Sequence, residues 1–151
     1  MKLQTKYFGE IEYDADDILT FPNGLYGFDD EHEFLLIPFE GSAGSLLCLQ
    51  SRTTPTLAFI LMDPFALQPD YLPILPKAEL SALGANKSDE LCYYVMCVVK
   101  QPIGDSTVNL KCPVAINPTT RVSVQVILDT NEYEMRHRLS RLKNGEEAIE
   151  C

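Results

Sequence analysis

The chain has 151 residues, a mass of 17.0 kDa, and 46% hydrophobic and 23% charged residues, the size and composition of one ordinary globular domain. Its 22 acidic and 12 basic residues give a formal net charge of −10, and such a field repels phosphate and argues against direct nucleic-acid binding. No apolar run approaches the roughly 20 residues that span a bilayer, and residues 1–6 lack the core of a signal peptide, so we expect a cytoplasmic protein without a membrane partner.

Short apolar stretches follow one another along the chain, separated by Pro, Gly, Asn and Asp, a pattern typical of all-β domains. The clearest turn is Pro-Asn-Gly at 22–24, which places glycine at a position of positive φ. The expected strands are residues 3–7, 10–13, 18–21, 34–39, 46–50, 57–62, 91–99, 107–110, 114–116 and 122–128.

One helix is expected among these strands. Pro76 suits a first turn, residues 77–83 have helix-forming composition, and Gly84 is a natural C-cap. Residues 91–99 are apolar on both faces, as in a central strand or the wall of a small barrel. The set predicts an all-β fold, a small antiparallel β-barrel or barrel-like sandwich with one short helix.

The stretch 106–117 is strand-like at both ends but is interrupted by Asn109 and by Cys112-Pro113. Asn is depleted in strands, and proline cannot donate to a ladder. We interpret the interruption as a corner where one strand ends and another begins, with the Asn109 amide satisfying backbone groups. Direct contact with a partner is the alternative.

The last residues differ from the rest of the chain. We expect a single domain over residues 1–135, followed by a charged tail or terminal helix over residues 136–151. Basic residues crowd the first half of this tail, Leu139 and Leu142 have helical spacing, and acidic residues follow. A frayed terminal helix and a solvated, disordered end both fit this pattern.

Five cysteines and two histidines offer little chemistry. No Cys-x-x-Cys occurs, and Cys92 and Cys97 fall on opposite faces of a strand, so we expect reduced, mostly buried thiols. His32 and His137 lie in charged runs, and the chain has no nucleophile motif or phosphate-binding glycine loop. We therefore expect a protein without enzymatic activity, metal or cofactor. The alternative is a hydrolase or a metal-dependent enzyme whose site is assembled from distant segments.

Two acidic clusters are more informative. Alternation places Glu10 and Glu12 on one face of a strand, with Ile11 and Tyr13 on the other. The clusters have three interpretations: an ordinary solvated face, a docking surface for a basic protein and, more weakly, a calcium site. The first cluster consists of Glu10, Glu12, Asp14, Asp16 and Asp17, and the second of Asp29, Asp30, Glu31 and Glu33.

Several segments, in order, resemble the bacterial flagellar assembly factor FliW family, and together they span about residues 3–133. Residues beyond 142 match no pattern of that family. The segments are TKYFG at 5–9, FPNGLYGF at 21–28, FLLIP at 34–38, LQS at 49–51, LAFILMDPF at 57–65, NLKCPVAIN at 109–117 and QVIL at 125–128. Members usually have a small residue, most often Ala, where this chain has Cys112.

The resemblance implies a non-catalytic, barrel-like protein that binds the RNA-binding translational repressor CsrA and also binds flagellin. Export of flagellin would free the protein to sequester CsrA and relieve repression of flagellin translation. A flagellin-specific chaperone without a role in translational control is the alternative.

We expect the partners to contact the first acidic cluster and exposed apolar groups around the 24–28 turn. A further group, shared with the family pattern, is expected to be structural. The apolar group is Leu25, Tyr26 and Phe28, and the structural group is Gln50, Asp63, Pro64, Asn109 and Pro113.

Overall fold

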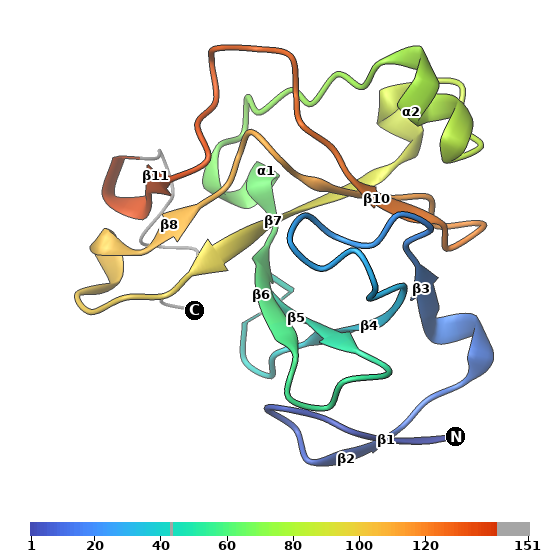
Figure 1. Cartoon of the computed structure of the whole chain (residues 1–151). Helices are drawn as coiled ribbons and strands as arrows, with labels where there is room; N and C mark the ends of the chain where they lie inside the picture. Colours follow the sequence, from blue (N-terminus) through green and yellow to red (C-terminus); the bar gives the residue numbers. More distant parts are fainter. Residues whose placement is uncertain (43, 142–151) are drawn as a thin grey trace.

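The computed structural model describes residues 1–42 and 44–141. These residues form mainly β-structure, with two short α-helices and four 3-10 turns (Figure 1). The strands are β1 (Lys2–Gln4), β2 (Glu10–Glu12), β3 (Ile18–Thr20), β4 (Glu33–Pro38), β5 (Leu46–Ser51), β6 (Ala58–Met62), β7 (Cys92–Val98), β8 (Thr107–Val108), β9 (Val114–Ile116), β10 (Ser123–Gln125) and β11 (His137–Arg138). The helices are α1 (Pro64–Leu67) and α2 (Lys77–Ala82), and the 3-10 turns are η1 (Ala15–Asp17), η2 (Ser88–Glu90), η3 (Ile103–Asp105) and η4 (Leu139–Arg141).

One twisted sheet forms the body of the molecule, with the antiparallel strand order β10-β9-β7-β6-β5-β4-β3. Its two outer strands approach at one isolated bridge between Thr20 and Val122, where the Thr20 N–H donates to the Arg121 carbonyl at 2.9 Å. The sheet therefore curls into a barrel-like shape without a continuous ladder at this seam. The predicted all-β, barrel-like class is confirmed.

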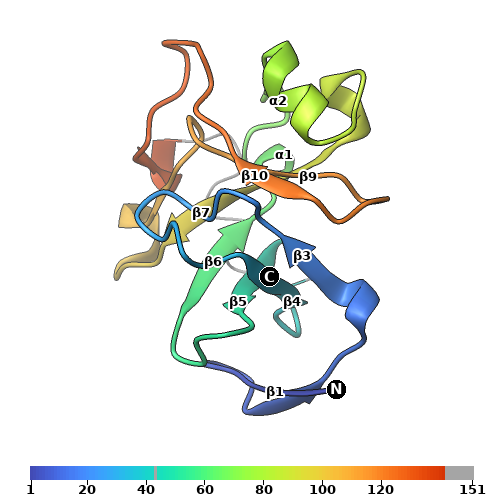
Figure 2. The same ribbon diagram turned by 45° about the vertical axis from the view of Figure 1, so that its right-hand side comes forward.

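Strands β1 and β2 form a separate hairpin at one end of the molecule, the lower end in both views (Figure 2). Leu3 pairs with Ile11 in this hairpin, and Leu3 is buried. Helices α1 and α2 lie toward the opposite end. The hairpin and the helices are therefore separated by the body of the sheet.

The central strands are apolar on both faces because the sheet has a core on each side. On β6, Leu61 belongs to the cluster enclosed by the curled sheet, and Met62 belongs to a second cluster beneath α1, α2 and β8. On β9, Val114 belongs to the enclosed cluster and Ala115 to the second cluster. Such double burial explains the uninterrupted apolar run of β7.

The stretch 106–117 is a corner. Strand β7 pairs with β8 near one end, Cys97 opposite Val108, and with β9 near the other, Cys92 opposite Ile116. Between the two partners the chain must leave one ladder and enter another. The Asn109 side-chain oxygen accepts the Cys112 N–H at 3.0 Å within this bend. Pro113 is buried immediately before β9, and its carbonyl accepts the Val126 N–H at 3.0 Å.

The helix content differs from the expectation in one respect. Helix α2 is where the sequence predicts it, and Gly84 follows it with φ +69°. Helix α1 was not predicted, so the expectation of a single helix is wrong. The Asp63 carboxylate accepts the Phe65 N–H at 2.9 Å and Pro64 opens the helix, so these two residues start a helix after they end a strand.

No helix among residues 1–42 and 44–141 combines the length and the apolar character that crossing a membrane requires.

Folded structure continues beyond residue 135, where the sequence analysis ends the domain. Strand β11 pairs with β8, His137 opposite Val108, and the Leu139 N–H donates to the Ser106 carbonyl at 2.9 Å. Leu139 is fully buried in the second core. The rest of the expected tail, residues 142–151, lies outside the described residues.

Replacing Leu139 by Ala should lower the free energy of unfolding by about 2–5 kcal/mol, because it opens a cavity in the core. Met135→Ala, at a residue that is 52% exposed, should change it by less than about 0.5 kcal/mol. Urea denaturation of both variants measures the difference. Equal stabilities would show that the segment after residue 135 is not packed on the domain.

Candidate functional site

The first acidic cluster forms an exposed surface at the hairpin end of the molecule. Glu10 and Glu12 lie on the exposed side of β2, and Ile11 between them is half-buried. The other three carboxylates belong to the following turn, where Asp17 accepts the Asp14 N–H at 2.9 Å. We call this surface the acidic face, and it consists of Glu10, Glu12, Asp14, Asp16 and Asp17.

Lys2 and Arg121 offset the charge of the acidic face only in part. Arg121 borders the same hollows as Glu12, Asp16 and Asp17, but it forms no ion pair with a described residue. Lys2 Nζ lies 3.9 Å from a Glu10 carboxylate oxygen, and both side chains are more than half exposed, so this pair is weak. Glu12 and Asp16 form no side-chain hydrogen bond or ion pair with any other described residue. The face therefore presents a net negative charge to solvent.

The hairpin that carries part of this face is fixed by the buried amide of Gln50 in β5. Its Oε1 accepts the Lys6 N–H at 2.9 Å. Its Nε2 donates to the carbonyl oxygens of Ser51 and Pro55 at 3.0 and 3.1 Å, and the carbonyl oxygen of Leu57 is a third acceptor at 3.3 Å. Gln50 is completely buried. One side chain thus joins the β1–β2 connection to the β5–β6 turn.

Arg52 provides a second connection to the same end of the molecule. Its Nε donates to the Tyr13 hydroxyl at 2.9 Å, and its guanidinium forms an ion pair with Glu33 at 3.0 Å. Charge-assisted hydrogen bonds of this kind have defined geometry. Tyr13 follows β2 directly, so Arg52 helps to hold the acidic face in place.

In the second acidic cluster, some carboxylates are hydrogen-bonded within the protein and others face solvent. The hydroxyls of Ser51 and Thr54 donate to the Glu31 carboxylate, and these hydrogen bonds hold the pKa of Glu31 below its ordinary value. Glu31 therefore stabilises the loop after β5. Asp29 and Asp30 are exposed.

The residues around the 24–28 turn do not share one environment. Gly24 has φ +68°, and a Cβ there would lie 2.5 Å from the Phe28 carbonyl oxygen, so only glycine fits. Tyr26 is 57% exposed, and Phe28 is 39% exposed with its ring edge-on to Phe59. Leu25 is only 2% exposed. The expectation of an exposed Leu25 is wrong, because its side chain belongs to the enclosed core.

Reactive groups are sparse in the part of the chain that the structure describes. No group of three or more His, Cys, Asp and Glu side chains there could hold a metal ion. Burial raises the pKa of the Cys48 and Cys97 thiols to about 11 and also raises that of Cys112. These three thiols are therefore protonated at neutral pH and are poor nucleophiles.

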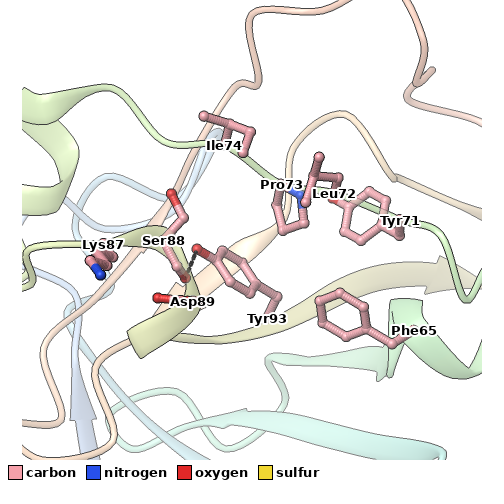
Figure 3. Close-up of a pocket in the computed structure, with 9 residues that line it drawn as sticks. All are labelled: Phe65, Tyr71, Leu72, Pro73, Ile74, Lys87, Ser88, Asp89 and Tyr93. Atoms are coloured by element: carbon pink, nitrogen blue, oxygen red, sulfur yellow. Dashed lines mark hydrogen bonds between the residues drawn. The ribbon is translucent and has the colours of Figure 1, made fainter.

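Sequence reasoning missed an apolar groove of about 370 Å³ between α1, residues 71–74 and η2 (Figure 3). Phe65 and Tyr93 line it on one side, and Leu72 and Ile74 lie above them in this view. The signal was present in the sequence, because residues 71–75 carry apolar side chains at successive positions of an extended segment. Alternate side chains of an extended segment point to opposite sides, so such a run exposes apolar groups wherever only one of its sides is covered.

Comparisons with known proteins agree on one family. The family model described as FliW protein matches residues 2–139. A flagellar assembly factor FliW of Geobacillus sp. (strain WCH70) is 39% identical over 139 residues, covering 92% of this chain and 95% of the relative. One of Caldanaerobacter subterraneus subsp. tengcongensis is 36% identical over 146 residues, covering 96% and 97%.

A solved structure supports the same result at the level of the fold. The crystal structure of the flagellar assembly factor FliW superimposes with a TM-score of 0.85 at 37% identity, covering 92% of this chain and 96% of that chain.

Replacing Gln50 by Ala should lower the free energy of unfolding by about 1–3 kcal/mol, because buried backbone groups lose their partners. The loss should be accompanied by faster amide exchange in residues 2–12, measured by hydrogen–deuterium exchange. Thr53→Ala changes a neighbouring side chain whose hydrogen bonds are to Ser51 and Glu31 rather than to the hairpin, and it should leave exchange in residues 2–12 unchanged. Unchanged exchange in Gln50→Ala would contradict the anchoring role.

Proposed function

The chain belongs to the FliW family of flagellar assembly factors, and from that membership we propose that it binds both the translational repressor CsrA and flagellin in the cytoplasm. Newly made flagellin occupies the protein until export removes it. The freed protein then sequesters CsrA, and translation of flagellin resumes. The function needs no catalysis and no cofactor, because each step is the exchange of one protein partner for another.

The acidic face is the observation that carries this proposal. It places five carboxylates in two adjacent elements at one end of a chain of net charge −10. An RNA-binding protein must present positive charge to phosphate, so it is an electrostatic match for this face. The same field repels RNA from a complex of the two proteins, even where the RNA site itself is uncovered.

Gln50 and Arg52 support the proposal because they hold this end of the molecule in one conformation. Carboxylates on a fixed surface lose less conformational entropy when a partner binds than carboxylates on a mobile loop. The face therefore suits recognition of a folded partner.

A flagellin-specific chaperone is the second candidate, and the 24–28 turn favours it. Tyr26 and Phe28 present exposed aromatic surface on a turn that Gly24 fixes. Exposed aromatic groups are common anchors for protein partners. This candidate requires no contact with CsrA, so a binding measurement with purified CsrA separates the two.

The double substitution Glu12→Lys and Asp16→Lys should weaken inhibition of CsrA–RNA binding by about tenfold at low salt, because it reverses charge on the acidic face. Both residues are exposed, and neither side chain forms a hydrogen bond or ion pair with the described residues, so the fold should be retained. The measurement is the affinity of CsrA for its RNA in the presence of saturating protein.

The matched control is Asp29→Lys with Asp30→Lys, which makes the same change of net charge at two exposed residues outside the acidic face. It should weaken inhibition much less. Added salt should reduce the difference between the two variants, because it screens exposed charges. Inhibition by the Glu12/Asp16 variant that equals the unsubstituted protein at both low and moderate salt would rule out the electrostatic mechanism.

A further inference from the structure

The segment between α1 and α2 is an extended strap, residues 71–75, with alternate side chains turned outward. Tyr71 and Leu75 are buried, whereas Leu72 and Ile74 are 65% and 61% exposed. Two isolated, fully solvated aliphatic side chains would need no explanation. Here they stand together beside the groove of Figure 3, on a segment of fixed conformation.

Three hydrogen bonds fix the strap. The Tyr71 hydroxyl donates to the Leu110 carbonyl at 2.6 Å. The Leu72 N–H donates to the Tyr133 hydroxyl at 2.9 Å, and the Leu75 N–H donates to the Ser88 hydroxyl at 3.0 Å. The exposed side chains of the strap are therefore held in position rather than exposed by disorder.

A groove lies on each side of the strap. The groove of about 370 Å³ contains Phe65, whose ring is 5.7 Å from that of Tyr71 and 6.3 Å from that of Tyr93. A second groove, of about 260 Å³, lies between the strap and residues 128–133. Leu72 and Ile74 border both grooves. The strap is thus an apolar ridge between two hollows, a shape that can receive side chains on both of its sides.

The rim of this surface is acidic. Asp89 borders the first groove, Asp129 and Glu132 border the second, and all three are exposed. None of them forms an ion pair within residues 1–42 and 44–141, and Lys87 is the one basic residue that borders either groove. An apolar partner with basic flanks fits this rim. A second copy of this chain fits this rim less well, because it would bring the same carboxylates and a net charge of −10 against it.

We propose that the strap and its two grooves are a docking surface for an amphipathic segment of another protein, with apolar anchors flanked by Lys or Arg. The apolar side chains pack against Leu72, Ile74 and Phe65, and the flanking cations face the acidic rim. This surface lies toward the other end of the molecule from the acidic face. The inference therefore goes beyond the proposed electrostatic mechanism and does not depend on it.

The test uses two fluorescein-labelled synthetic peptides with the same amphipathic, Leu- and Phe-containing helical core. One peptide carries Lys residues at both ends, and the other carries Glu residues there. Fluorescence anisotropy with the full chain should give a dissociation constant of about 10 μM for the Lys-flanked peptide and binding at least about tenfold weaker for the other. Added salt should weaken the Lys-flanked peptide more.

Leu72→Ser with Ile74→Ser should weaken binding of the Lys-flanked peptide by about tenfold or more, because it removes the apolar ridge. Val98→Ser with Val99→Ser is the matched control, since these residues are 58% and 49% exposed and border neither groove. The control should bind the peptide as the unsubstituted chain does. A third variant, D89N/D129N/E132Q, should bind the two peptides equally.

Thermal unfolding checks that each variant folds. Equal affinity of the unsubstituted chain for the two peptides would overturn the proposal, as would unaltered binding by the Leu72/Ile74 variant. Absence of binding below about 100 μM would also overturn it. A dimer in sedimentation analysis that the Leu72/Ile74 variant dissociates would assign the surface to a second copy of the chain instead.

Discussion

The hairpin that carries Glu10 and Glu12 of the acidic face is anchored by one buried side chain. Gln50 is completely buried in β5, and its amide accepts from the Lys6 N–H and donates to carbonyls of the β5–β6 turn. The β1–β2 hairpin forms a separate two-stranded sheet, and such a hairpin has little stability of its own. Without this amide the hairpin would lose a specific connection to the body of the molecule, and Glu10 and Glu12 would lose a fixed position.

The barrel-like sheet separates two surfaces of different chemistry. The acidic face, at the hairpin end, presents charge on short polar side chains, whereas the strap, toward the helical end, presents aliphatic groups within an acidic rim (Figure 1). Both surfaces favour basic partners, because carboxylates surround each of them. A segment bound at the strap, as proposed, would leave the acidic face open, so the two proposed docking surfaces could be occupied at the same time.

Much of the fold could be predicted from the sequence, because short apolar stretches between turn residues specify strands directly, and β7 and its neighbours lie where that pattern indicates. Helix α1 was missed because Asp63-Pro64 ends a strand equally well whether or not a helix follows. The burial of Leu25 depends on tertiary packing beside exposed Tyr26, and the partner of Gln50 is 44 residues away in sequence. The strap was missed because apolar residues at successive positions also indicate a strand buried on both faces.

We propose that this chain works by binding protein partners rather than by catalysis. The decisive experiment is isothermal titration calorimetry of the purified chain against purified CsrA and, separately, against flagellin. We expect a saturable binding isotherm with each partner, and weaker binding of CsrA as ionic strength rises. Absence of binding to both partners at low salt would contradict it.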